Sequence, residues 1–293
     1  MDNFVKTLKT PSPLTGEGRG EGEDTCNQKL FAVFGNPIAH SLSPLMHQSA
    51  MNRMGIKALY VPFCVQDLKA AVQGVRGLDI RGVSVTLPFK TEVMKYLDEI
   101  DEASRNIGAV NTIFNHQGML KGCNTDWLGF VLSLKEVLEI KEKRFAVLGA
   151  GGAARGILYG LIQEGGYPII LNRTISKAEN LAREFGCAFL SLSEIENLEA
   201  EVLINTTSLG MAPDINKSPF PQEHLKKFGW VVDIIYNPLK TRLLQEAEEA
   251  GCKTISGLEM FVHQGAEQIK VWTGLEPPRA YMHEVVLKKL REK

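Results

Sequence analysis

The stretch FAVLGAGGAARG, residues 145–156, decides the fold of the chain. It joins an apolar run typical of a buried strand to a segment with helical periodicity over residues 153–163. Between them, Gly149 permits a tight turn, Gly151 lets the backbone approach a pyrophosphate, and Ala154 allows close packing of the helix on the strand. The start of the helix would face the phosphates with its N–H groups. The stretch therefore predicts a dinucleotide site whose loop residues are Gly149, Ala150, Gly151, Gly152 and Ala153.

The segments around this turn alternate in the same way. Further strands are expected over residues 169–171, 201–204, 230–234 and 253–255, and a helix over residues 176–185. A glycine-rich turn alone is a weak signal, because an ordinary strand-to-helix loop can contain it. Here the strand, the helix and their spacing are all present. The pattern predicts a doubly wound parallel sheet of the Rossmann type.

The end of the next strand indicates which dinucleotide binds. About 20 residues after the glycine-rich turn, an NAD site usually places Asp or Glu on the ribose hydroxyl. This chain has Asn172-Arg173-Thr174 there, followed by Lys177. Arg173 can stack on adenine and contact a 2′-phosphate, and cations at a helix start are unfavourable unless an anion is bound. We therefore expect NADP(H) rather than NAD; solvated surface cations are the plainer alternative.

The first part of the chain also alternates, with strands expected over residues 30–34, 58–61 and 82–86. Ser43 is the expected N-cap of a helix with Pro44 at its first position, and Pro88 is expected to open another helix. Residues 111–114 and 119–121 flank a hairpin-like turn. With 293 residues, the chain is expected to hold two α/β domains, and the sheet of the first is expected to be mostly parallel.

Composition excludes several classes of protein. The 33 Lys and Arg balance 34 Asp and Glu, which gives no support to a nucleic-acid or membrane-binding surface. No stretch approaches the ~20 apolar residues of a membrane-spanning helix, and the N-terminus lacks the apolar core of a secretory signal. The five cysteines are far apart and the six histidines lack ligand-like spacing. We therefore expect free thiols, a cytoplasmic protein and no metal.

Several polar motifs lie in turns between apolar segments, where functional residues concentrate. In chain order they are GNPIAHSLSP from Gly35, VTLPFK from Val85, GAVNT from Gly108, NTDWLG from Asn124, NTTSLGM from Asn205, DIIYNPLKT from Asp233 and GLEMFVHQGAEQ from Gly257. On these motifs, all present in this order, the chain resembles the shikimate dehydrogenase family from about Lys29 to its C-terminus. No motif position departs from the family pattern.

The resemblance implies a fold and an activity. The implied reaction is the reversible, NADPH-dependent reduction of 3-dehydroshikimate to shikimate, a step of aromatic amino-acid biosynthesis. Residues 29–126 plus 258–293 would form a substrate-binding domain and residues 127–257 an NADP-binding Rossmann domain, in a monomer or homodimer. The family pattern does not explain residues 1–28, whose Gly-, Glu- and Pro-rich composition predicts a disordered extension, with a regulatory arm as the alternative.

Lys90 and Asp126 are the catalytic residues that the resemblance implies. Hydride addition to a ketone leaves an alkoxide, which Lys90 can stabilise and protonate. Burial lowers the pKa of a lysine while a nearby carboxylate raises it, so the pair would titrate together. The plainer interpretations are a surface lysine and a helix N-cap at Asp126.

The resemblance also assigns binding residues. Ser41 and Ser43 would bind the substrate carboxylate, although Ser43 could instead only cap its helix. The other residues expected to contact the substrate are Thr86, Asn111 and Gln264, on ring hydroxyls, and Tyr236, on the carboxylate, unless Tyr236 is a core aromatic. Ile234 and Gly257 would lie near the nicotinamide, with Glu102 at the rim. No histidine is needed as acid or base, and His40, His47 and His263 are expected to be buried and hydrogen-bonded.

Three alternatives remain at this point. A quinate/shikimate dehydrogenase of the same family would use NAD, against which Asn172-Arg173-Thr174 speaks. Another Rossmann oxidoreductase would not predict Ser41, Ser43, Lys90 and Asp126 together. A nucleotide-sensing module would keep the fold without the chemistry, against which the presence of Lys90 and Asp126 argues.

Overall fold

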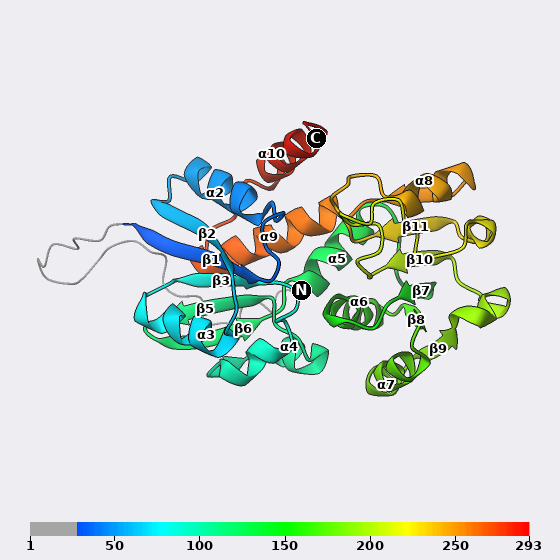
Figure 1. Cartoon of the computed structure of the whole chain (residues 1–293), viewed down its shortest axis with the longest axis horizontal. Helices are drawn as coiled ribbons and strands as arrows, with labels where there is room; N and C mark the ends of the chain where they lie inside the picture. The colour runs from blue at the N-terminus through cyan, green and yellow to red at the C-terminus, as the bar shows by residue number, and fades with distance from the viewer. Residues whose placement is uncertain (1–27, 293) are drawn as a thin grey trace, which may run out of the picture. The chain divides into compact units, whose positions relative to one another are not determined.

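The structure is a computed structural model that describes residues 28–292, so the extension expected over residues 1–28 falls almost wholly outside it. The chain forms two compact units, each with its own sheet (Figure 1). The first unit comprises residues up to Asp101, Val110–Thr125 and Gly265–Val285, and the second comprises Glu102–Ala109, Asp126–Gln264 and residues from Val286. The domain bounds expected from the sequence stay a prediction.

The first unit is built on a six-stranded mixed sheet of order β2-β1-β3-β5-β6-β4. Its strands are β1 (Lys29–Gly35), β2 (Ala58–Cys64), β3 (Gly82–Val85), β4 (Glu99–Ile100), β5 (Thr112–His116) and β6 (Met119–Cys123). β1 pairs in parallel with β2 and β3, and β4 with β6, whereas β5 is antiparallel to β3 and β6. The β5–β6 hairpin makes the sheet mixed, and its turn residues Gln117 and Gly118 both have the positive φ that a type I′ turn requires.

Alternation along the strands gives this sheet two different faces. The helices of the unit are α2 (Ser43–Arg53), α3 (Leu68–Gly77), the 3₁₀ helix η1 (Glu92–Tyr96), the second half of α9 (Leu258–Thr273) and most of α10 (Arg279–Arg291). Ala32 and Phe34 of β1 pack with α3 in an apolar core. On the opposite face Phe31 contacts Trp272 of α9, with ring centroids 5.3 Å apart. A β-carbon on Gly82 would lie 2.4 Å from the Trp272 indole nitrogen, so α9 lies directly on this second face.

Two local predictions for this unit are wrong. The helix α2 begins at Ser43 itself, and its N-cap position is occupied by Leu42. The Ser41 hydroxyl accepts from Ser43 N over 3.2 Å, and the start of α2 has no side-chain cap. Pro88 opens no α-helix, because Phe89 N donates to Thr86 O in a tight turn and only η1 follows.

The second unit holds a six-stranded, all-parallel sheet of order β12-β11-β10-β7-β8-β9. Its strands are β7 (Arg144–Leu148), β8 (Tyr167–Asn172), β9 (Ala188–Ser191), β10 (Val202–Asn205), β11 (Trp230–Asp233) and β12 (Lys253–Ile255). Its helices are α4 (Glu102–Ile107), α5 (Asp126–Lys135), α6 (Gly152–Gln163), α7 (Ile175–Phe185), α8 (Arg242–Glu249), the first half of α9, and the 3₁₀ helices η2 (Leu192–Asn197) and η3 (Gln222–Lys227). The strand order reverses at β7, so the predicted doubly wound α/β fold is confirmed.

Both faces of this second sheet are buried. Phe145 and Val147 of β7 pack against α5, α6 and α7, while Ala146 and Leu148 pack in a second core with α8 and the 3₁₀ helices. Burial on both faces explains why these strands are almost continuously apolar in the sequence.

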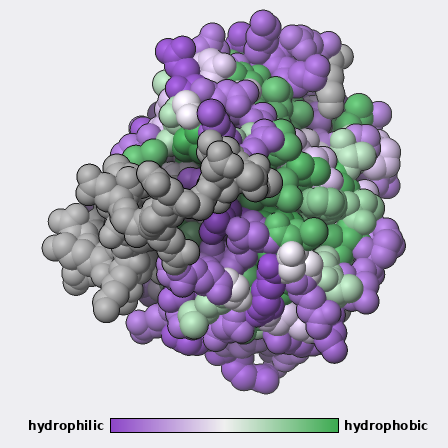
Figure 2. All heavy atoms as spheres, turned by 90° about the vertical axis from the view of Figure 1, so that its left-hand side faces the viewer, coloured by the Kyte–Doolittle hydropathy of each residue, from purple (hydrophilic) through white to green (hydrophobic). Residues whose placement is uncertain are grey.

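No helix among the described residues is long and apolar enough to cross a membrane. Apolar surface does reach the solvent on the face that Figure 2 shows, bordered by hydrophilic side chains. On the edge strand β2 of the first sheet, Leu59 and Phe63 are both exposed. An exposed apolar edge strand is a place where another chain can pair. The expected monomer or homodimer stays a prediction.

Candidate active site

Three segments of the first unit meet at the edge of its sheet where the strands β1 and β3 end. Two follow the parallel strands β1 and β3, and the third precedes β5, whose antiparallel direction brings its start to the same edge. Val85 N donates to Asn111 O over 2.7 Å, and Val110 N donates to Lys90 O over 2.8 Å. The fold therefore gathers Thr86, Lys90 and Asn111, which the sequence analysis placed in one site.

The segment after β1 brings the two expected serines to this edge. A β-carbon on Gly35 would lie 2.5 Å from Thr86 Cγ2, so glycine is what lets the segments after β1 and β3 come together. Ser41 and Ser43 lie next to each other through the 3.2 Å bond from Ser43 N to Ser41 Oγ. Ser43 is buried and Ser41 is half-buried, an arrangement in which two hydroxyls can converge on one anion.

The side chain of Asn111 has a fixed orientation. Its Oδ1 accepts from Thr112 Oγ1 over 2.7 Å and from Thr125 N over 2.8 Å, while Nδ2 donates to Thr125 Oγ1 over 3.0 Å. Both ends of this amide are therefore bonded to protein groups, and its Oδ1 accepts two of these bonds. Thr125 is followed directly by Asp126, the buried first residue of α5, so the same bonds anchor the chain just before the expected catalytic carboxylate.

The glycine-rich turn of the second unit fits a pyrophosphate. Gly149 has φ of +110°, and a β-carbon there would lie 2.6 Å from Thr206 Oγ1, so only glycine is tolerated. Gly151 is the N-cap residue of α6, and a β-carbon on it would meet no atom of the described residues within 4 Å. The first N–H groups of α6 therefore lie beside open space at the point where the strand order reverses.

The residues that follow β8 suit the 2′-phosphate of NADP. Asn172 Nδ2 donates to Thr174 O over 2.9 Å, which shapes the turn into α7. Arg173, Thr174 and Lys177 are exposed, and the first turn of α7 contains no acidic residue. The positive end of the helix dipole and two cations thus face solvent together, as a phosphate site requires.

Asp233, which opens one of the polar motifs but had no role assigned to it, is a buried carboxylate that joins the loops after β10 and β11. Asp233 Oδ1 accepts from Asn205 Nδ2 and from Ile235 N, each over 3.0 Å, and Oδ2 accepts from Thr241 Oγ1 over 2.7 Å. Burial raises the pKa of Asp233 to about 6, although these three donors act in the opposite direction. These bonds fix the backbone immediately before Ile234.

Ile234 and Gly257, both expected near the nicotinamide, are direct neighbours. Gly257 N donates to Ile235 O over 3.1 Å, and there is no room for a side chain on Gly257. Tyr236 stacks on Phe261 with ring centroids 4.1 Å apart.

Two other expected site residues lie elsewhere in the second unit. Gln264 is buried on α9, where its Nε2 donates to Phe261 O over 2.8 Å, and Glu102 is exposed at the start of α4.

The histidines divide into two kinds. His47 and His263 are buried as expected, whereas His40 is exposed because it lies in the turn before α2.

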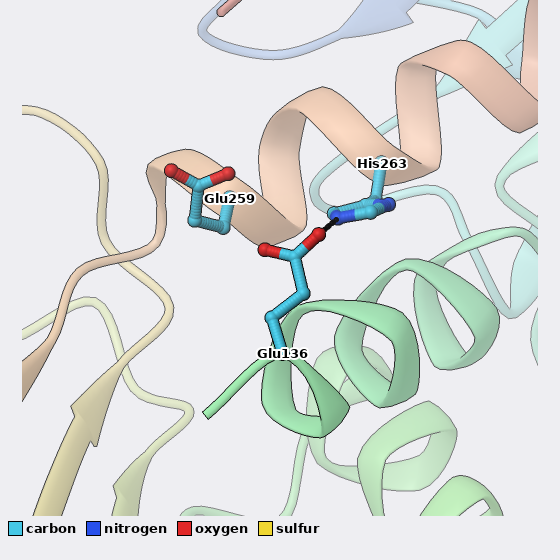
Figure 3. Close-up of side chains that lie close together, drawn as sticks. All are labelled: Glu136, Glu259 and His263. Atoms are coloured by element: carbon cyan, nitrogen blue, oxygen red, sulfur yellow. Dashed lines mark hydrogen bonds and ion pairs between the residues drawn. The ribbon is translucent and has the colours of Figure 1, made fainter. Parts of the chain in front are cut away.

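His263 Nε2 lies 3.0 Å from Glu136 Oε1, and Glu259, one helical turn earlier on α9, faces the same place (Figure 3). One ligand atom from each of the three side chains lies within 4.8 Å of the others, a grouping that sequence spacing did not reveal. The hydrogen bond engages Nε2 of His263, and it joins α9 to the residue that directly follows α5.

Comparison with known proteins identifies the family. Residues 33–113 match the shikimate dehydrogenase substrate binding domain, residues 132–234 match shikimate / quinate 5-dehydrogenase, and residues 257–287 match the shikimate 5′-dehydrogenase C-terminal domain. A shikimate dehydrogenase (NADP(+)) from Pyrococcus abyssi is 45% identical over 264 residues, which cover 89% of this chain and 98% of that protein. This chain belongs to the shikimate dehydrogenase family.

Solved structures of the family have the same fold. Shikimate 5-dehydrogenase from Thermus thermophilus, in complex with NADP(H) and shikimate, is 38% identical with a TM-score of 0.82, covering 89% of this chain and 99% of that one. Shikimate 5-dehydrogenase from Listeria monocytogenes, in complex with shikimate and NAD, is 36% identical with a TM-score of 0.81, covering 88% and 96%. The family fold thus accompanies either dinucleotide in solved complexes.

Proposed function

We propose that this member of the shikimate dehydrogenase family catalyses the reversible reduction of 3-dehydroshikimate to shikimate with NADPH. The observation that carries the proposal is the gathering of Thr86, Lys90 and Asn111 at one sheet edge, beside the serine pair. When a ketone substrate is held there, its ring hydroxyls contact hydrogen-bond donors and its carbonyl oxygen contacts a cation.

The proton transfer rests on Lys90. When bound, NADPH supplies a hydride to the carbonyl carbon, and the carbonyl oxygen then needs one proton. Lys90 Nζ stabilises the developing negative charge and donates that proton, and it regains one from water afterwards. Asp126 is the carboxylate that orients the lysine ammonium.

Recognition of the substrate rests on hydrogen-bond donors. The hydroxyls of Ser41 and Ser43 bind the carboxylate, and Tyr236 adds a further donor to it. Asn111 Nδ2, Thr86 and Gln264 contact the ring hydroxyls. A site built from such bonds rejects analogues that lack a hydroxyl, because its buried polar groups would then lose their partners.

NADP(H) would be held by three groups of residues in the second unit. The pyrophosphate lies on the turn formed by Gly149, Ala150, Gly151, Gly152 and Ala153. The 2′-phosphate is bound by Asn172, Arg173, Thr174 and Lys177. Ile234 and Gly257 border the nicotinamide, with Glu102 at the rim. The free thiols of the described cysteines suit a reducing cytoplasm, where we place the enzyme.

Replacing Lys90 tests the proposal. The Lys90→Met variant should lower kcat for shikimate oxidation by about 10²–10⁴-fold, the usual contribution of a general acid–base group. Its Kd for NADP⁺, measured by fluorescence titration, should remain that of the wild type. The matched control is Lys95→Met, which removes an exposed lysine of η1 and should leave kcat unchanged. Wild-type turnover by Lys90→Met would contradict the assigned role.

A second candidate is the oxidation of quinate with NAD. Two observations favour this candidate. The chain matches a shikimate / quinate 5-dehydrogenase family, and the Listeria relative was solved in complex with NAD. The exposed Arg173 and Lys177 at the start of α7 argue against NAD as the preferred cofactor.

A further inference from the structure

A line of buried polar side chains lies between α9 and the sheet of the first unit, and the reaction described above does not use it. Gln268 of α9 is at its centre. Its Oε1 accepts from Ser84 Oγ over 2.7 Å, and its Nε2 donates to Asn111 O over 3.1 Å and to Thr112 Oγ1 over 3.0 Å. The Gln268 side chain is therefore bonded at both ends inside the protein, and one bond fixes the main chain of Asn111.

His47 of α2 connects these side chains to the Ser41–Ser43 segment. Its Nε2 lies 3.1 Å from Gln268 Oε1 and its Nδ1 lies 2.9 Å from Ser43 O. The ring is fully buried and stacks on Tyr60, with ring centroids 4.4 Å apart and planes 12° apart. Tyr60 OH in turn donates to Ser84 Oγ over 2.6 Å, and Ser84 is the residue that donates to Gln268. His47 and Gln268 thus lie between Ser43 and Asn111.

Close packing of α9 on α2 makes these bonds possible. A β-carbon on Gly265 would lie 2.2 Å from Met46 Cε and 3.3 Å from His47 Cε1. The glycine therefore allows the approach that places Gln268 within hydrogen-bond distance of His47. Trp272, one turn further along α9, donates from Nε1 to Ile113 O over 2.9 Å and fixes the helix on the sheet.

Stability alone does not account for this arrangement. An imidazole and an amide buried in a core contribute little net stability, because their bonds only replace those that they made with water. Apolar side chains of similar volume would fill the same space at no such cost. Buried polar side chains that bond to one another do, however, hold one another in one arrangement. The two segments it joins are the ones that carry proposed substrate ligands.

We propose that His47 and Gln268 are positioning residues, which hold the Ser41–Ser43 segment and Asn111 at the separation that the substrate requires. The inference rests on the function proposed above. Neither side chain touches the substrate: Gln268 acts through the main chain of Asn111, and His47 acts through the main chain of Ser43 and through Gln268. Loss of either link should weaken substrate binding more than it weakens cofactor binding.

Steady-state kinetics of shikimate oxidation, with KM determined separately for shikimate and NADP⁺, tests the inference. Gln268→Met keeps the volume and removes the bonds, and it should raise KM for shikimate about tenfold, the effect of one lost buried hydrogen bond. Its KM for NADP⁺ should stay at the wild-type value. At position 47, a glutamine places a donor near Nε2 and an asparagine places one near Nδ1. Each variant keeps one of the two links of His47 and loses the other, so both His47→Gln and His47→Asn should raise KM for shikimate.

The matched control is Asn115→Ala. Asn115 is a buried residue of the same sheet, whose Nδ2 donates to the carbonyls of Val75 and Ile80 and whose Oδ1 accepts from Gly118 N. Its loss should lower stability without changing KM for shikimate. An unchanged KM in Gln268→Met, or the same rise in Asn115→Ala, would overturn the inference and leave the proposed function intact. A wild type without shikimate turnover would overturn the proposed function, and this inference with it.

Discussion

Gly257 touches the backbone of Ile234 so closely that a β-carbon on it would lie 2.1 Å from the Ile234 carbonyl oxygen. The contact joins the loops after β11 and β12, at the carboxyl edge of the parallel sheet where a Rossmann domain binds its ligand. The shape of this edge therefore depends on the absence of a side chain at one position.

Substitution of Gly257 by alanine should damage both stability and cofactor binding. The added methyl group must displace backbone, at a cost of about 1–3 kcal/mol of unfolding free energy. The displaced loop should also raise KM for NADP⁺. Urea unfolding and steady-state kinetics measure the two effects. Gly229→Ala is the control, because its β-carbon would meet only Glu201 O at 3.7 Å. Equal behaviour of the two variants would show that the close approach has no functional role.

Replacing Arg173 should weaken the binding of NADP⁺ but not that of NAD⁺. Arg173→Gln removes a charge-assisted bond to the 2′-phosphate, so KM for NADP⁺ should rise roughly 10–100-fold. KM for NAD⁺, which lacks that phosphate, should change little. Arg183→Gln, at the other end of α7 with its side chain 72% exposed, is the matched control and should affect neither. A parallel rise for both cofactors would place Arg173 away from the 2′-phosphate.

His47 should make the protein less stable in acid. Burial lowers the pKa of His47 to about 4, below its ordinary value of 6.5, so the folded state binds fewer protons than the unfolded state between these values. Its contribution is present above pH 6.5 and is lost as the pH falls towards 4. Urea unfolding at pH 7 and pH 5 should show about 2 kcal/mol more loss in the wild type than in His47→Gln. Identical pH dependence in the two proteins would mean that His47 titrates normally.

Asp233, in contrast to His47, should make the protein more stable as the pH falls. Its pKa is raised by burial from 3.8 to about 6, so the folded state binds more protons between these values, and the contribution is lost as the pH rises through 6. Asp233→Asn keeps the shape of the side chain and removes this titration. The wild type should therefore gain about 1 kcal/mol relative to the variant when the pH changes from 7 to 5. A difference of the opposite sign would show that the three hydrogen-bond donors outweigh burial.

Local features of the site could be predicted from the sequence. The strand, glycine turn and helix at residues 145–163 are contiguous, and the requirement for glycine at Gly149 follows from the turn itself. The hairpin turn at Gln117-Gly118 and the cations after β8 are local in the same sense. The gathering of Thr86, Lys90 and Asn111 was expected through the family resemblance, and the sheet topology accounts for it.

Features that depend on distant partners could not be predicted in this way. Gln268 bonds to Asn111 across 157 residues and His47 bonds to Gln268 across 221, so neither pairing leaves a periodic or spaced pattern. The triple bonding of Asp233 likewise depends on Asn205, which belongs to a neighbouring strand. The helix opened by Pro88 was wrongly predicted because the competing turn from Thr86 to Phe89 is not visible in residue preferences.

The most direct test of the central claim is nicotinamide absorbance during oxidation of shikimate and of quinate, each with NADP⁺ and with NAD⁺. We predict rapid turnover with shikimate and NADP⁺ and much slower turnover in the other three combinations. Equal or faster turnover with quinate and NAD⁺ would contradict the assigned specificity while keeping the family, and absence of turnover in all four would contradict the proposed function itself.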